Sequence, residues 1–478
     1  MIPRLFAYLS VSLLPLFTWA ADTGPSTASG PLRVHPDNPC WFARPDGQAV
    51  WLTGSHTWAN FQERGIDGQT PDFDYEAYLD FLQRHGHNFI RLWSWEQAQW
   101  MQFVDKEVPV RYKPSPYQRT GPGRALDGGA KFDLTKFNDE YFGRLRQRVE
   151  LAGQRGIYVS VMFFQGFSLD KRRGNAKAGN AWHGHPFNEA NNVNSIDGNP
   201  SGDDSGHEVH ELKVPKITRL QEAFVRRVIE AVGDLDNVLW EIGNECHSGS
   251  VRWQYHMIRF VKQVESARTQ QHPVGMTGAP IGTRELMASP ADWISPPGKQ
   301  WLTDPPANDG AKVIFVDTDH CDPWNHDPDW VWKNLFRGNQ FILMDGYVDF
   351  RIGSPEKPDP KWDVTRQAMG RARELAERIE LAGLTPNTEL ASTGFCLATP
   401  VNSAGIFRCA VYLPPRGEAT VDLTGIKGPV TVEWIETKAD TRHEAAGVQG
   451  GSRPRFVAPL PGPAILWLTG RSGSDDLR

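Results

Sequence analysis

Short apolar segments alternate with amphipathic segments along most of the chain, and this alternation limits the possible folds most strongly. Strand-like segments lie at 50–54, 88–93, 157–164, 238–242, 273–277, 292–295, 312–317 and 341–345. Helical segments lie between them; within 135–155, for example, Tyr141, Leu145 and Val149 recur at helical spacing. Eight strands with intervening helices over about 350 residues predict an α/β fold, a (β/α)8 TIM barrel.

The pattern changes from about residue 386. Strand-like segments separated by Gly- and Pro-rich turns lie at 407–413, 419–423, 430–435, 455–458 and 464–468. They predict a small all-β sandwich after the barrel. We therefore expect the barrel over 31–385, the sandwich over 386–470 and a tail over 471–478.

The N-terminal segment is typical of an export signal. Arg4 precedes an apolar stretch at 5–17, and Thr18-Trp19-Ala20 before Ala21 resembles a cleavage site. A signal peptide is predicted over 1–20 and a linker over 21–30, so the mature protein is expected in the periplasm or outside the cell. Neither this stretch nor any later one is long enough to span a membrane.

Composition excludes some classes of protein. The 478 residues include 51 Lys and Arg against 57 Asp and Glu, a net charge of −6, which argues against a nucleic-acid partner. Five cysteines are too few for a disulfide scaffold. Cys396 and Cys409 are the best pair for a bridge, and reduced buried thiols are an equal alternative. No motif indicates a cofactor, and the oligomeric state is not determined.

Acidic side chains lie at the ends of two predicted strands. Asn244 and Glu245 follow the fourth strand, and Asp317 and Asp319, two residues apart and so on one face, end the seventh. A carboxylate pair in the barrel mouth can act as acid/base and nucleophile on a glycosidic bond. A separation of about 5 Å gives retention of configuration and a wider one gives inversion. Glu241 lies mid-strand and is expected to pair with a barrel cation such as Arg91.

Other polar and aromatic residues follow the strand ends, the face on which such barrels carry their sites. Those predicted to bind substrate are Arg91, Asn244, His56, Trp58, Trp93, Gln165, His247, His320, Asp345 and Tyr347. Aromatic rings can stack on sugars, but packing is the common alternative for a single ring or imidazole. Two long segments, 97–131 and 165–213, are expected as inserted loops on the same face.

Several of these motifs resemble known families. Trp-Glu-Ile-Gly-Asn-Glu, ending at Glu245, and Phe-Ile-Arg-Leu-Trp around Arg91 resemble the clan of barrel glycoside hydrolases that includes the cellulases. Leu-Arg-Val-His-Pro-Asp-Asn and Val-Trp-Leu-Thr-Gly-Ser-His-Thr-Trp are similar to the apiosidase-like glycoside hydrolases. Val-Tyr-Leu-Pro-Pro-Arg-Gly-Glu and Val-Glu-Trp resemble a β module named for collagen binding. Together these likenesses cover 31–470.

The resemblance implies a role for each carboxylate. Glu245 would be the general acid/base. Asp317-Thr318-Asp319 stands where the apiosidase-like relatives tend to have Asp-Gly-Glu, so Asp319 would be the nucleophile or base despite its shorter side chain. Asp345 is a third candidate, or a sugar-binding group.

The favoured function is hydrolysis of glycosidic bonds in a polysaccharide or its side chains. One alternative is a metal-dependent hydrolase, suggested by His320, Cys321, Asp322 and His326 near Cys246 and His247, although no HExxH or paired CxxC spacing is present. The other is a non-catalytic surface protein that binds carbohydrate or matrix.

Overall fold

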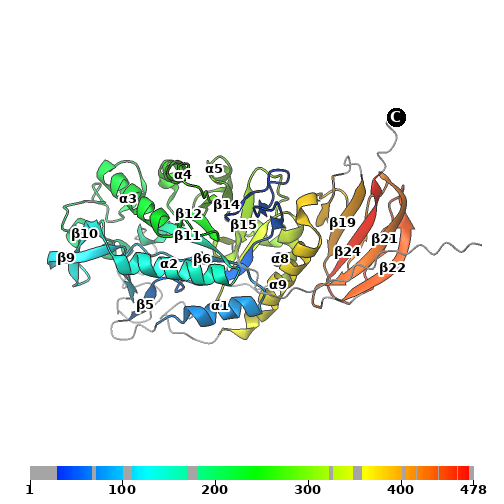
Figure 1. Cartoon of the computed structure of the whole chain (residues 1–478), viewed down its shortest axis with the longest axis horizontal. Coiled ribbons are helices and arrows are strands. Elements are labelled where there is room, and N and C mark those ends of the chain that lie inside the picture. The colour runs from blue at the N-terminus through cyan, green and yellow to red at the C-terminus, as the bar shows by residue number, and fades with distance from the viewer. Residues whose placement is uncertain are drawn as a thin grey trace, which may run out of the picture.

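Eight parallel strands form a nearly closed barrel, which confirms the predicted fold class (Figure 1). The computed structural model describes residues 30–66, 72–100, 110–169, 180–321, 327–347, 358–400, 405–415, 417–439, 441–459 and 461–472. The strands are β4 (Thr53–His56), β6 (Phe89–Leu92), β11 (Tyr158–Gln165), β12 (Val238–Asn244), β13 (Val274–Thr277), β14 (Trp293–Ser295), β15 (Val313–Asp317) and β16 (Gln340–Met344). The predicted signal peptide and nearly all of the predicted linker lie outside the described residues.

The barrel closes where β4 meets β6. The amide of Asn88 donates to the carbonyl of Thr53 at 3.0 Å, and the Asn88 side chain accepts from the Thr53 amide at 2.9 Å. Gly54 makes this approach possible, because a Cβ on it would lie 1.8 Å from the carbonyl oxygen of Phe89.

We therefore expect Gly54→Ala to lower the free energy of unfolding by about 1–3 kcal/mol, since an added methyl group forces the two strands apart. Gly143→Ala is the matched control. Gly143 lies inside a helix with nothing within 4 Å of an added Cβ, so the same change there should stabilise by about 0.5–1 kcal/mol. Urea unfolding of both variants measures the difference. Equal stabilities would contradict the close approach of β4 and β6 at Gly54.

Helices pack around the barrel, and their side-chain caps determine where several begin. The helices are α1 (Tyr75–Arg84), α2 (Asp139–Gln154), α3 (Pro215–Val232), α4 (Val251–Glu265), α5 (Thr283–Met287), α6 (Gln300–Thr303), α7 (Thr318–Cys321), α8 (Pro328–Phe336) and α9 (Asp363–Arg378). Asp74 caps α1 by accepting from the amide of Ala77. Asn138 caps α2 in the same way.

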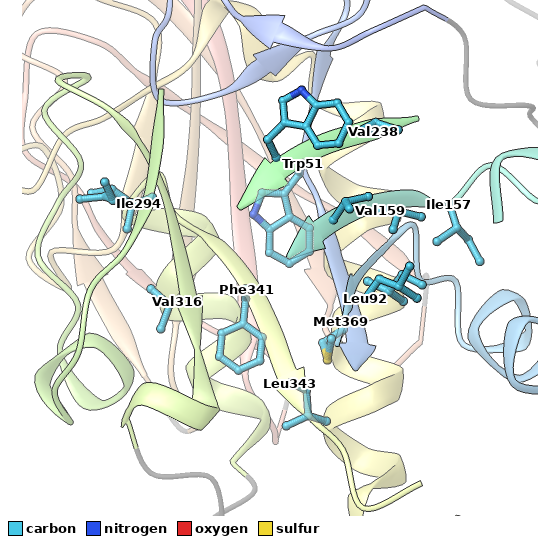
Figure 2. Close-up of a cluster of buried hydrophobic side chains, with 14 of the residues drawn as sticks. Trp51, Leu92, Ile157, Val159, Val238, Ile294, Val316, Phe341, Leu343 and Met369 are labelled. Carbon is cyan, nitrogen blue, oxygen red and sulfur yellow. The ribbon is translucent and has the colours of Figure 1, made fainter. Parts of the chain in front are cut away.

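Residues along each barrel strand alternate between two environments. Phe89, Leu239 and Phe315 belong to a cluster at the base of the barrel that includes Leu32 and Phe42 from the N-terminal segment. That segment forms a small sheet of β1 (Arg33–Val34), β2 (Phe42–Ala43) and β3 (Ala49–Val50). The intervening strand residues pack against the helices in one large cluster. Figure 2 shows Phe341 and Leu343 of β16 together with Met369 of α9 in this cluster. Every second side chain of a strand points to the same side. The side chains two positions after Phe89, Leu239 and Phe315 are therefore also directed into the barrel.

The two segments expected as loops contain regular secondary structure, and the first of them contains strands. β7 (Gln99–Trp100) and β8 (Val110–Lys113) join β5 (Glu63–Ile66) in a three-stranded sheet, and β9 (Tyr117–Arg124) pairs with β10 (Ala130–Phe137) in a hairpin. Thr135 therefore lies in a strand, not at the start of α2. The second segment contains the 3-10 helices η1 (Gly166–Leu169), η3 (Ala181–Gly184), η4 (Glu189–Asn191) and η5 (His207–His210).

An all-β domain follows the barrel, as predicted. Its main sheet has the order β17 (Thr385–Pro386), β18 (Cys396–Ala398), β19 (Ile406–Leu413), β24 (Ala464–Ser472), β21 (Ile426–Glu436) and β22 (Arg442–Gln449). β20 (Glu418–Thr420) and β23 (Arg455–Val457) form a second, two-stranded sheet. Beside β18 and β19, the sulfurs of Cys396 and Cys409 lie 3.5 Å apart as free thiols, and the contact with Cys409 together with burial raises the pKa of Cys396.

The main sheet packs against the barrel helices. Tyr412 of β19 stacks on Trp332 of α8 and donates to Asp329 at 2.6 Å. Leu397, Ala410 and other residues of this face share a single hydrophobic cluster with the barrel helices. Among the described residues, no helix combines the length and apolar character needed to cross a bilayer.

Candidate active site

Arg91 of β6 lies at the centre of a buried charge cluster inside the barrel. Its guanidinium forms a bidentate pair with Glu241 of β12, including a 3.0 Å bond from Nε, and donates from Nη1 to Asp317 of β15 at 2.7 Å. All three side chains are at most 1% exposed. They follow the base residues Phe89, Leu239 and Phe315 by two positions, which directs them inward. The expected pairing of Glu241 with Arg91 is thus observed.

Trp93 determines the tautomer of His56, which in turn binds Asp317. An indole N–H can only donate, so at 2.8 Å the Nδ1 atom of His56 must accept from it. Nε2 of His56 therefore carries a proton and donates to Asp317 at 3.1 Å. Burial raises the pKa of Asp317, but its interactions with His56 and Arg91 outweigh this and hold the pKa well below its ordinary value.

Asp317 also holds the backbone of the next acidic residue. Its Oδ1 atom accepts from the amide of Asp319 at 2.9 Å. Because the Asp317 carboxylate is fully buried and bound by three donors, it cannot readily reach a substrate. The geometry favours a positioning role for Asp317.

Asn244 connects the charge cluster to His320. Its side-chain oxygen accepts from Arg91 at 2.7 Å, and its amide nitrogen lies 3.3 Å from the Gln165 side-chain oxygen. Nε2 of His320 lies 2.9 Å from the same Asn244 oxygen and must therefore be protonated, while Nδ1 lies 3.1 Å from the Ser295 hydroxyl.

Glu245 and Asp319 are the partly exposed carboxylates beside this scaffold. Glu245 follows β12 with φ of +48°, in the left-handed region, and Asp319 lies in α7 directly after β15. One carboxylate oxygen from each and one ring nitrogen of His320 all lie within 4.8 Å of one another. This separation is closer to the roughly 5 Å of retaining glycosidases than to the roughly 6.5–9.5 Å of inverting ones.

The same three side chains lie close enough together to hold a metal ion, and of the metal ligands suggested by the sequence only His320 is among them. A histidine binds a metal through an unprotonated nitrogen, but Nε2 of His320 donates to Asn244 and Nδ1 is directed to the Ser295 hydroxyl at 3.1 Å. Burial raises the pKa of Cys246 well above its usual value, which disfavours the thiolate that a metal requires. Asp322 and His326 lie outside the described residues. The donor set therefore suits a carboxylate mechanism better than metal-assisted hydrolysis.

Three further residues predicted to bind substrate are partly exposed. Trp58 is partly exposed, with its ring against Trp93 and Trp95. His247 is also partly exposed and stacks on His207 with ring centres 4.3 Å apart. Burial and the neighbouring His207 lower the pKa of His247 to about 4, so its ring is neutral at pH 7. Tyr347 is partly exposed and packs against Tyr78 and Phe81.

The position of Asp345 argues against its predicted role in sugar binding. Its carboxylate is fully buried and pairs with Arg366 of α9, including a bond of 2.8 Å from Nε. Asp345 therefore anchors α9 to the end of β16. Gln165 is likewise buried, and its side-chain oxygen accepts from Asn244 and from the Phe167 amide.

Glu96, whose side chain is 11% exposed, is a further acidic group beside the site that the sequence did not indicate. Its carboxylate lies 2.9 Å from His210 and 3.4 Å from His185, and accepts from the Gln165 amide at 2.7 Å. Burial raises the pKa of Glu96, but the two histidines lower it further, to about 2. This cluster fastens the second inserted segment to the ends of β6 and β11. Only its place after a strand end, in Trp-Ser-Trp-Glu, could have drawn attention to Glu96.

A family model covers one part of the site. The model described as Domain of unknown function (DUF6298) matches residues 93–280, which include Glu96, Asn244 and Glu245. No curated protein shows a significant match to the sequence.

Solved structures of glycoside hydrolases resemble the whole chain. One described as a glycoside hydrolase has a TM-score of 0.59 at 12% identity and covers 94% of this chain and 98% of its own. A glycoside hydrolase family 5 from Bacteroides vulgatus has a TM-score of 0.58 at 12% identity, with 95% and 97% covered. The protein shares the fold of these enzymes. At this identity the likeness concerns the fold, so activity must be argued from the site itself.

Proposed function

We propose that the protein is a glycoside hydrolase that cleaves glycosidic bonds of a polysaccharide or its side chains. The observation that carries the proposal is the pair Glu245 and Asp319, whose carboxylate oxygens lie within 4.8 Å in the mouth of the barrel. The fold shared with glycoside hydrolases supports the proposal, and so does the buried Arg91 network that holds both strand ends.

The proposed reaction retains the anomeric configuration. Glu245, protonated, donates its proton to the leaving oxygen while the Asp319 carboxylate attacks the anomeric carbon. Glu245 then removes a proton from a water molecule, and the resulting hydroxide displaces Asp319 from the glycosyl ester. Asp317 stays ionised throughout and holds the Asp319 backbone in place.

The narrower assignments rest on sequence. The N-terminal segment supports export to the periplasm or beyond, and the opening motifs support an apiosidase-like subtype. For the C-terminal domain, the contact with α8 supports a role in stabilising the barrel rather than in binding collagen.

A panel of plant, algal and microbial polysaccharides tests the activity. We expect release of reducing sugar from at least one of them. Proton NMR during the reaction should show the product first in the anomeric configuration of the substrate. Product appearing first in the opposite configuration would contradict the retaining scheme.

We expect Asp319→Asn to reduce kcat by about a thousandfold, because the amide is a poor nucleophile. Sodium azide should restore turnover and give a glycosyl azide of inverted configuration. Asp317→Asn is the control. It should also lose activity, through the disturbed Arg91 and His56 contacts, but azide should not rescue it because the site is fully buried. If azide rescued Asp317→Asn and not Asp319→Asn, Asp317 would be the nucleophile and Asp319 the positioning residue.

A further inference from the structure

Residues 197–208 read Asp-Gly-Asn-Pro-Ser-Gly-Asp-Asp-Ser-Gly-His-Glu. Oxygen-bearing side chains occupy the first, third and fifth positions, a glycine the sixth and a glutamate the twelfth. This is the ligand spacing of an EF-hand calcium loop, with Ser201 where Asp or Asn is usual. Gly202, at the sixth position, has φ of +72°, which suits the sharp turn such a loop makes there.

An independent observation at the twelfth position points to a ligand. Glu208 is only 6% exposed, and its carboxylate is turned into the loop, where Oε1 accepts from the amide of Ser201 at 3.2 Å. Its Oε2 atom is buried and has no hydrogen-bond partner within the described part of the chain. A buried carboxylate oxygen without a partner is costly, and a bound cation would remove that cost.

The loop is held closed over Trp182. A Cβ on Gly198 or Gly206 would lie 2.7 Å or 2.3 Å from atoms of that ring, so both glycines pack directly on it. Asp204 is turned to His183, 3.0 Å away, and lies outside the ligand positions.

We propose that this loop binds a calcium ion through Asp197, Asn199, Ser201 and Glu208, with backbone carbonyls and water completing the coordination. The donors are all oxygens on a flexible loop, which favours Ca2+ over the smaller Mg2+ with its strict octahedral geometry. A dissociation constant of about 10⁻⁴ to 10⁻³ M is expected, as in extracellular calcium modules.

The site would stabilise one flank of the barrel mouth. Glu208 lies in η5 beside His207, which stacks on His247, two residues after Glu245. Calcium bound at Glu208 would therefore hold that imidazole pair in position. This inference does not depend on the proposed hydrolase activity.

Tryptophan-sensitised terbium luminescence of the full chain tests the site, because Trp182 lies beneath the loop and Tb3+ substitutes for Ca2+. We expect luminescence that Ca2+ displaces and Mg2+ does not. Excess Ca2+ should raise the unfolding temperature of EGTA-treated protein by about 2–4 °C. Glu208→Gln and Asp197→Asn should each raise the Ca2+ concentration needed to displace Tb3+ at least tenfold. Glu189→Gln changes an exposed glutamate in the same inserted segment and should leave that concentration unchanged.

Asp197→Asn keeps the test decisive if Glu208→Gln fails to fold. Asp197 is exposed, and an asparagine still offers an oxygen to the Asn199 amide, which Asp197 binds at 2.8 Å. Loss of signal in this variant also assigns the ion to the loop rather than to the carboxylates at Glu245 and Asp319. Absence of Tb3+ luminescence and of a Ca2+-dependent shift in the wild type, or both unchanged in Asp197→Asn, would overturn the proposal.

Discussion

Glu245→Gln should lower kcat/KM on polysaccharide by about 10²–10⁴-fold, since an amide can neither donate the catalytic proton nor remove one from water. The loss should be smaller for the first step on aryl glycosides whose leaving group needs no proton, so an initial burst followed by slow turnover is expected. Steady-state and stopped-flow assays on the two substrate types measure this difference.

The matched control for Glu245 is Glu230→Gln, on the exposed side of α3. It should retain full activity, and both variants should unfold at the wild-type temperature, because Gln and Glu fit the same backbone at position 245 equally well. Full polysaccharide activity in Glu245→Gln would remove the basis of the proposed mechanism.

Arg91→Met should lower the free energy of unfolding by about 3–5 kcal/mol. The substitution leaves Glu241 and Asp317 as neighbouring buried carboxylates without their cation, and removing one partner of a buried ion pair exposes the desolvation cost of the other. Protonation of one carboxylate would relieve part of this cost. Urea unfolding at neutral pH measures the loss, and a smaller difference from wild type is expected at acid pH.

Arg146→Met is the control for Arg91. Arg146 also binds two carboxylates, Asp234 and Glu150, but all three side chains are at least 40% exposed. Surface pairs of this kind contribute about 0–1 kcal/mol. If the two substitutions lowered the free energy of unfolding equally, burial could not be the reason for the large loss expected at Arg91.

The sequence predicts the barrel well because its signal is local. Each barrel strand is a short buried segment, so apolar runs between helices revealed all eight. Helix starts were less accurate, as at α2, which was expected from residue 135 but begins at Asp139, because the Asn138 cap is a local contact that periodicity does not show. β22 was missed because it is a mostly exposed edge strand, rich in polar residues, with no apolar alternation to reveal it.

The candidate site could be predicted only in part. Asn244 and Glu245 follow from the end of a predicted strand, whereas the family resemblance pointed to Arg91 and favoured Asp319 over Asp317. The partner of Asp345 could not be foreseen, since Arg366 is brought to it by the packing of α9. The same holds for Glu96, whose histidines come from a distant inserted segment.

The contact between the C-terminal sheet and α8 bears on how such a chain could be shortened or recombined. Tyr412 and its neighbours complete a core that the barrel helices begin, so the boundary near residue 386 divides the topology but not the packing. A barrel cut at that point would present an apolar surface to water. The two parts are therefore better regarded as one packing unit than as a barrel with an exchangeable accessory domain.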